Sequence, residues 1–201
     1  MISKSIEVTL YNGKMLLNTK NTNYSFGSLQ SILKKGLLEI GAAEINRMES
    51  ILILGVAGGS VVQTLVNDFS FSKKITGIEL DSEIIHIANS YFGLDKISNF
   101  KCFIQDAEQF VKTDKNQYDL LIIDIFKDTD MPEFLFQESF ITNCKQLLNK
   151  NGYILFNTMH LYKNNLSKTE AYLSHFDSNL YETKVLKNIE KYNDVILIKS
   201  I

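Results

Sequence analysis

Residues 51–60 read ILILGVAGGS, an unbroken apolar run that ends in a glycine-rich turn. A strand without alternating polar residues is one whose two faces are both covered, which is typical of a parallel sheet between helices. Glycines directly after such a strand let the backbone approach a ligand and lead into a helix whose first N–H groups are free. The stretch therefore predicts the first strand–turn–helix unit of an α/β nucleotide-binding domain.

The alternation of strand and helix continues toward the C-terminus. Further strands are predicted at 75–80, 100–105, 118–124 and 153–158. Helices are predicted at 59–69, 82–92, 107–112, 134–149 and 167–176. The runs 180–187 and 193–199 then predict an antiparallel hairpin that closes the sheet. Such repeats imply right-handed crossovers. We expect a doubly wound, Rossmann-like sheet of seven strands, mostly parallel, with an antiparallel C-terminal hairpin.

The N-terminal segment has a different pattern. Residues 5–11 alternate between polar and apolar side chains, and Asn12-Gly13 separates them from a second apolar run at 15–17. Asn-Gly between two such runs is a strong hairpin signal, because both residues tolerate positive φ. The polar stretch 18–27 indicates a loop, and Ser28 is typical of a helix cap. We expect a β-hairpin extension over residues 1–27 and a nucleotide-binding domain over 28–201.

Composition narrows the function classes. The chain has 201 residues, 45% of them hydrophobic and 22% charged, which suits one compact domain. A net charge of −2 provides no broad basic field, so nucleic acid is disfavoured as a partner. There is no C-x-x-C motif, no dense His/Cys cluster, no signal-peptide pattern and no apolar run of roughly 20 residues. We expect a cytoplasmic protein with no metal site and no membrane contact.

Two strand ends predict a nucleoside site, because open α/β sheets bind ligands beyond the C-terminal ends of their strands. The turn Gly55, Val56, Ala57, Gly58 and Gly59 can approach a nucleotide closely, although a turn without a ligand would have the same glycines. Glu79 ends the second strand, and Leu80 follows it. A carboxylate there can accept from both ribose hydroxyls. The alternatives are that Glu79 is simply solvated or that it caps the next helix, for which Asp81 is better placed.

The next two strand ends carry aspartates. Asp106 and Ala107 follow the third strand, where the carboxylate can accept from the exocyclic amine of adenine or can cap the short helix. Asp124 ends the run 118–124, and a carboxylate there must be solvated or matched to a ligand. It can orient an amine acceptor and take its proton. A hydrogen bond from Asp124 to the loop 125–133 is the alternative.

In this order the strand ends resemble the class I S-adenosylmethionine-dependent methyltransferase fold and, more narrowly, its spermidine synthase-like branch. The similarity covers roughly residues 5–160 and includes Glu-x-Asp at 79–81 and Tyr-Asp-x-x-x-x-Asp at 118–124. The resemblance implies S-adenosylmethionine, or its decarboxylated form, as the cofactor. It also implies Glu79 on ribose, Asp106 near adenine and Asp124 at the reaction centre.

The chain also departs from that branch. Aminopropyltransferases usually carry an Asp where this chain has Gly58, and a second Asp where it has Lys127. Their segment between hairpin and helix has a Gln, an acidic pair and a Tyr-His, and in the corresponding stretch 21–27 of this chain only Tyr24 is a plausible counterpart. Recognition of a polyamine needs carboxylates spaced along its several positive charges. We therefore expect a methyltransferase that acts on a small, amine-bearing acceptor, with Asp124 and Tyr24 as its catalytic residues.

Two further functions stay open. One is a polyamine aminopropyltransferase that uses decarboxylated S-adenosylmethionine, and the other is a catalytically degenerate nucleoside-binding module. An NAD-linked enzyme is disfavoured, because GVAGGS lacks the G-x-G-x-x-G spacing. The apolar hairpin and the C-terminal strands can each pair between two copies, so a homodimer is also open.

Overall fold

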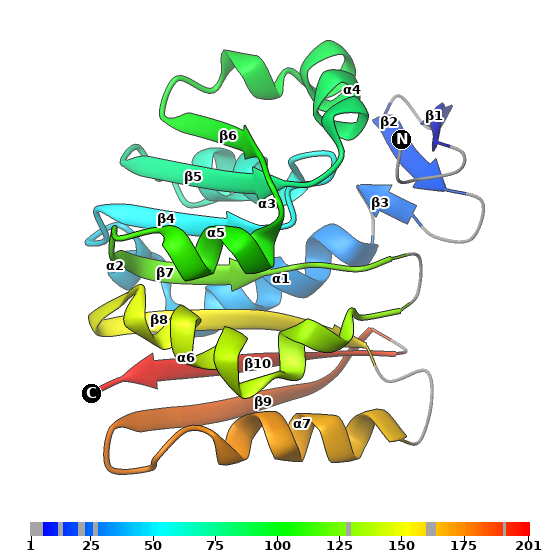
Figure 1. Cartoon of the computed structure of the whole chain (residues 1–201). Coiled ribbons are helices and arrows are strands. Elements are labelled where there is room, and N and C mark those ends of the chain that lie inside the picture. The colour runs from blue at the N-terminus through cyan, green and yellow to red at the C-terminus, as the bar shows by residue number, and fades with distance from the viewer. Residues whose placement is uncertain are drawn as a thin grey trace.

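The computed structural model describes residues 6–11, 14–19, 23–25, 28–127, 130–159, 164–190 and 192–201. These residues form two sheets (Figure 1).

The smaller sheet has the order β1-β2-β3 and consists of β1 (Ile6–Tyr11), β2 (Lys14–Thr19) and β3 (Asn23–Ser25). Antiparallel pairing from Ile6↔Thr19 to Tyr11↔Lys14 confirms the predicted hairpin, and its Asn12-Gly13 turn lies outside the described residues.

The larger sheet has seven strands in the order β6-β5-β4-β7-β8-β10-β9. The strands are β4 (Ser50–Leu54), β5 (Lys74–Glu79), β6 (Phe100–Ile104), β7 (Tyr118–Ile123), β8 (Leu148–Met159), β9 (Tyr181–Glu190) and β10 (Asn193–Ser200). Strands β4 to β8 pair in parallel, and β10 runs antiparallel to both β8 and β9. This arrangement confirms the predicted fold class. The strand order reverses beside β4, where the glycine-rich turn begins.

Helices cover both faces of this sheet. They are α1 (Ser28–Ile40), α2 (Ala42–Ile45), α3 (Ser60–Gln63), α4 (Ser82–Phe92), α5 (Ala107–Thr113), α6 (Glu138–Gln146) and α7 (Asn164–Ser174). In Figure 1 α5, α6 and α7 lie in front of the sheet and α1 and α3 behind it. Each face has its own apolar core, one built with Leu37 of α1 and Val62 of α3, the other with Val111 of α5 and Phe140 of α6. No helix within the described ranges is long and apolar enough to cross a membrane.

The predicted helix 134–149 is wrong in its extent. The structure has a 3₁₀ turn at Glu133–Phe136 and then α6, with Gln137 in an extended conformation between them. The helix ends at Gln146, because Leu148 already pairs with Tyr118 and opens β8. Apolar residues at 147–148 fit a helix face and a buried strand equally well, so their pattern alone does not locate this boundary.

Two smaller predictions also need correction. The predicted loop 18–27 contains β3, whose polar residues pair with β2 at the edge of the small sheet.

The predicted helix 59–69 is α-helical only over α3 and continues as a π-helix at Thr64–Asp68. There the Thr64 hydroxyl donates to Ser60 O at 2.9 Å and accepts from Gln30 Nε2 at 3.1 Å. These two hydrogen bonds of the Thr64 side chain lie at the start of the π-helical turn.

Candidate functional site

Three of the predicted site residues, Gly55, Glu79 and Asp124, lie at the C-terminal ends of neighbouring strands. Successive side chains of a strand point to opposite faces. Ile53 of β4 pairs with Ile122 of β7, and both belong to the core on the α1 and α3 face. Gly55 and Asp124 lie two residues further along their strands and continue on that face. The C-terminal ends of these strands point to the right in Figure 1, toward the small sheet.

Gly55 brings the glycine-rich turn against the end of β7. Its φ is +89°, a conformation that L side chains rarely adopt, and a Cβ placed there would collide with the carbonyl oxygen of Asp124. The backbone N–H of Asp124 donates to Leu54 O at 2.9 Å, which holds the two segments together. Only glycine fits here, so the turn and Asp124 keep a fixed relation.

Glu79 points its carboxylate at the glycine-rich turn. Oε2 accepts from the backbone N–H groups of Val56 and Ala57 at 3.1 and 3.0 Å, and Oε1 accepts from those of Leu80 and Asp81 at 2.8 and 3.1 Å. An ionised carboxylate has about four lone-pair sites. A ribose diol bound here therefore has to replace some of these amide donors.

Glu79 does not cap the following helix, α4. Asp81 caps α4, and its side chain accepts from the Glu83 N–H at 3.0 Å. Glu79 therefore either braces the turn, binds ribose, or does both in different states. The ribose role stays a prediction.

Two exposed aliphatic side chains lie next to Glu79. Leu80 follows it in the chain and is 48% exposed. Ile104 pairs with Glu79 across β5 and β6 and is 51% exposed. Side chains of this kind can pack against the flat faces of a purine. The sequence analysis included Leu80 but missed Ile104, whose exposure depends on β6 being an edge strand.

Asp106 caps a helix, which is the alternative to adenine binding that the sequence left open. It is the N-cap of α5, and its Oδ1 accepts from the Gln109 N–H at 2.9 Å. Ala107 is the first residue of that helix and is buried. The cap uses one carboxylate oxygen, so the predicted contact with adenine would use the other.

Asp124 is held by an asparagine of the neighbouring strand. Its Oδ1 accepts from Asn157 Nδ2 at 2.8 Å. The pKa of Asp124 is raised to about 6, mainly because burial disfavours the charged form; the hydrogen bond from Asn157 acts to lower this pKa and the charge of Glu79 acts to raise it. In the part of the chain that the structure describes, the side-chain hydrogen bond of Asp124 thus goes to β8, not to the loop 125–133. A carboxylate with this pKa is ionised at neutral pH and is well matched to accept a proton.

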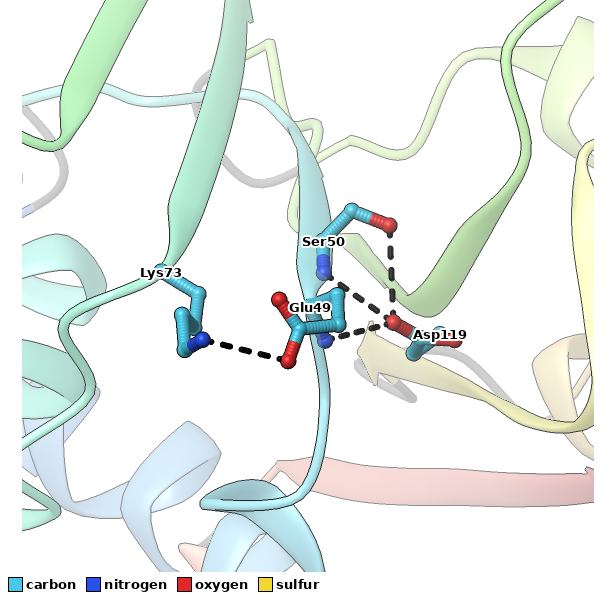
Figure 2. A network of polar contacts seen from close by, with 4 residues as sticks. All are labelled: Glu49, Ser50, Lys73 and Asp119. Atoms are coloured by element: carbon cyan, nitrogen blue, oxygen red, sulfur yellow. Dashed lines mark hydrogen bonds and ion pairs between the residues drawn. The ribbon is translucent and has the colours of Figure 1, made fainter.

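The other aspartate of the Tyr-Asp-x-x-x-x-Asp motif lies at the opposite end of β7. Asp119 Oδ2 accepts from the backbone N–H groups of Glu49 and Ser50 at 2.7 and 3.0 Å, as Figure 2 shows. Its Oδ1 accepts from Asn149 Nδ2 at 2.7 Å. Asp119 therefore fastens β4, β7 and the start of β8, and it has no part in the candidate site.

Tyr24 and Lys127 are not placed in the site by these contacts. Tyr24 belongs to β3, and its side chain lies outside the described part of the chain. Lys127 and Asp130 exchange backbone hydrogen bonds at 2.8 and 3.0 Å within the loop that follows β7. Tyr24 as a catalytic residue therefore stays a prediction.

Most of the chain is similar to proteins of one known family. Residues 30–198 match the family model of the spermine/spermidine synthase domain. A polyamine aminopropyltransferase of Vibrio vulnificus is 31% identical over 152 residues, which are 74% of this chain and 50% of that protein. The chain spans about half the length of the curated relatives it matches first, with 50%, 43% and 43% of their lengths covered.

Solved structures share the fold. A probable spermidine synthase from Corynebacterium glutamicum superposes with a TM-score of 0.79 at 17% identity, over 97% of this chain and 76% of that one. Human methyltransferase-like protein 13, solved in complex with SAH, superposes with a TM-score of 0.65 at 19% identity, over 87% and 78% of the two chains. At these identities the likeness concerns the fold alone.

Proposed function

The chain belongs to the spermine/spermidine synthase domain family, and from this premise we propose that it transfers an aminopropyl group from decarboxylated S-adenosylmethionine to a small amine. The observation that carries the proposal is the ionisable Asp124, held by Asn157 against the glycine-rich turn that Glu79 faces. Methyl transfer, the function expected from the sequence, is now the second candidate. The curated relatives with matching sequence are named polyamine aminopropyltransferases, which favours aminopropyl transfer.

The side chains at the strand ends have the chemistry that an adenosyl group requires. Glu79 offers acceptors for the ribose diol, the exposed side chains of Leu80 and Ile104 offer an apolar surface for adenine, and Asp106 retains one oxygen for its amine. The backbone N–H groups of Val56 and Ala57, now bonded to Glu79, are donors that become available when ribose takes their place.

Asp124 would prepare the acceptor. An amine attacks only when its nitrogen is unprotonated, and most amines are protonated at neutral pH. Oδ1 of Asp124 is occupied by Asn157, so Oδ2 is the atom that would meet the acceptor nitrogen. Asp124 would first accept a proton from the acceptor ammonium. The neutral amine then forms a C–N bond at a carbon next to the donor sulfonium while the C–S bond breaks, which gives a secondary ammonium and a neutral thioether.

The acceptor would be smaller or less charged than a long polyamine. Gly58 is buried and has no carboxylate to offer, and Lys127 adds positive charge in the loop after β7. Carboxylates spaced along a cationic substrate are what discriminate a polyamine. The same two residues are the observation that keeps methyl transfer as the second candidate.

The proposal is tested by comparing donors. The chain is incubated with 1,4-diaminobutane and either decarboxylated S-adenosylmethionine or S-adenosylmethionine, and products are identified by mass spectrometry, with Asp124→Asn as the control. We expect 5′-methylthioadenosine and an aminopropylated diamine from the decarboxylated donor, and a strong reduction in the control. S-adenosylhomocysteine formed from S-adenosylmethionine would favour the second candidate. Binding without turnover of either donor would indicate a nucleoside-binding module.

A further inference from the structure

Two buried amide side chains connect β10, through β8, to Asp124 at the end of β7. Asn193 Nδ2 donates to Asn157 Oδ1 at 3.0 Å, and Asn157 Nδ2 donates to Asp124 Oδ1 at 2.8 Å. The first two side chains are 5% and 2% exposed. The three residues come from β10, from β8 and from the end of β7, which are neighbours in the sheet.

We propose that Asn157 is a positioning residue for Asp124, and that Asn193 fixes the amide orientation in which Asn157 acts. The proposal rests on the proposed function only in taking Asp124 as the reaction-centre carboxylate. It assigns a task to two residues that the sequence analysis did not single out.

The chemistry of the groups allows one orientation. An ionised carboxylate can only accept, so Asn157 must turn its NH₂ toward Asp124. Its carbonyl oxygen then faces β10, where Asn193 must present its own NH₂. The orientation of both amides is thus set by the ionised state of Asp124. Conversely, with both amides in place one oxygen of Asp124 is held and the carboxyl plane has a fixed direction.

Burial makes this arrangement costly to abandon. A buried amide that loses its partner keeps the full penalty of leaving water. If Asn157 flipped, its carbonyl would face the carboxylate and its NH₂ would face the NH₂ of Asn193, so two contacts would be lost at once. Asn193 therefore acts on Asp124 through Asn157, without touching it.

The surroundings of Asp124 give the proposal a measurable consequence. Among the described residues, Glu79 is the charged group that acts on Asp124. Its charge raises the pKa of Asp124, whereas the hydrogen bond from Asn157 lowers that pKa. Removing that hydrogen bond leaves burial and Glu79 unopposed. The pKa of Asp124 must then rise above its present value of about 6.

The test is a carboxyl ¹³C NMR titration of the free protein with labelled aspartate. The Asp124 signal is assigned by its loss in Asp124→Asn, and the titration is repeated for Asn157→Leu, Asn193→Leu and Thr158→Val. Thr158 is the matched control, because it is buried on the same strand and its hydroxyl donates to Asp194 O at 3.1 Å, away from Asp124.

We expect Asn157→Leu to raise the pKa of Asp124 by about 1 unit, the size that a lost hydrogen bond to a charged group implies. Asn193→Leu should raise it by a smaller amount, and Thr158→Val should leave it unchanged. An unchanged pKa in a folded Asn157→Leu would overturn the proposal, as would an equal shift in Thr158→Val. If Asn157→Leu does not fold, Asn193→Leu decides alone, and an unchanged pKa there overturns the proposal.

The titration needs no donor and no acceptor, so its outcome is independent of turnover. A pKa shift in a protein that transfers no aminopropyl group would remove the proposed function and leave the positioning intact. Turnover by the parent chain without a pKa shift in the variants would do the reverse.

Discussion

The backbone N–H of Ala57 donates to Glu79 Oε2 at 3.0 Å, and Ala57 itself has a φ of +47°. The bond ties the glycine-rich turn to β5 while the turn holds a non-glycine residue in the left-handed region. That conformation costs an L-residue roughly 1 kcal/mol or more, whereas glycine adopts it freely. The turn is therefore strained at the point where the donor is proposed to bind.

Ala57→Gly should relieve this strain. We expect the free energy of unfolding to rise by roughly 0.5–1 kcal/mol, after allowance for the greater freedom of glycine in the unfolded chain. Urea denaturation measures the change. Ala171→Gly is the control, because Ala171 is exposed in α7 and glycine in a helix should lower stability by about 1 kcal/mol. Equal losses in both variants would show that the turn is not strained.

Tyr172→Phe should stabilise the protein. Tyr172 Oη is buried without a hydrogen-bond partner in the part of the chain that the structure describes, and its ring packs against Phe136, Phe156 and Phe176. Removing an unsatisfied buried hydroxyl and keeping the ring should add about 1 kcal/mol to the unfolding free energy. Tyr118→Phe is the opposite case, because Tyr118 Oη donates to Asp114 Oδ2 at 2.8 Å. Loss of this hydrogen bond in Tyr118→Phe should lower the free energy of unfolding by about 1 kcal/mol. A higher free energy of unfolding for Tyr118→Phe would contradict this contrast between the two tyrosines.

Asp124→Asn should change how stability depends on pH. The folded-state pKa of Asp124 is raised to about 6, above the value near 3.9 of an unfolded chain. The folded protein thus binds more protons between these values, and the parent chain loses stability as pH rises through this window. Asparagine does not titrate. We expect Asp124→Asn to be more stable than the parent by roughly 2–3 kcal/mol at pH 7.5, and to have no such advantage at pH 3.5.

Denaturation curves for parent and variant across this range measure the difference directly. Other titrating groups are common to both proteins and cancel. An advantage of the variant that stays constant from pH 3.5 to 7.5 would show that Asp124 has an ordinary pKa.

Asp119→Asn should weaken the fold and spare the site. The change disturbs the carboxylate that accepts from Glu49 and Ser50 in Figure 2, at the end of the sheet away from Asp124. Hydrogen bonds to a charged group are worth about 1.5–3 kcal/mol, so we expect a loss of about 2 kcal/mol in unfolding free energy. Binding of an adenosyl ligand, measured at a temperature where the variant is folded, should be unchanged. A weakened affinity would mean that this network supports the site.

The fold could be predicted well where local signals and burial agree. Helix α4 spans the predicted residues because Asp81 caps its start and Gly93, at φ +65°, ends it. The central strands were predicted because helices on both faces demand continuous apolar runs. The boundary between α6 and β8 was not predictable, since it depends on the pairing of Leu148 with Tyr118, a contact between distant segments.

The site could be predicted in part for the same reason. Gly55, Glu79 and Asp124 each stand at the end of an apolar run in the sequence, so the sequence alone indicates that they lie at strand ends. Asn157 lies inside the buried strand β8 and Asn193 is the first residue of β10. A polar residue at the end of the run YILFN was a signal that the sequence analysis passed over. Their partners could not have been inferred, because the contact requires β10 to lie beside β8.

The central claim is that Glu79 holds the sugar of an adenosyl group, and calorimetric titration with 5′-methylthioadenosine tests it most directly. The parent chain, Glu79→Gln and, as the control, Asp119→Asn, whose changed side chain lies at the other end of the sheet, are compared under conditions in which all three are folded. We expect binding by the parent and by Asp119→Asn, and a dissociation constant about 10- to 100-fold higher for Glu79→Gln. A folded Glu79→Gln that binds as tightly as the parent would contradict the account.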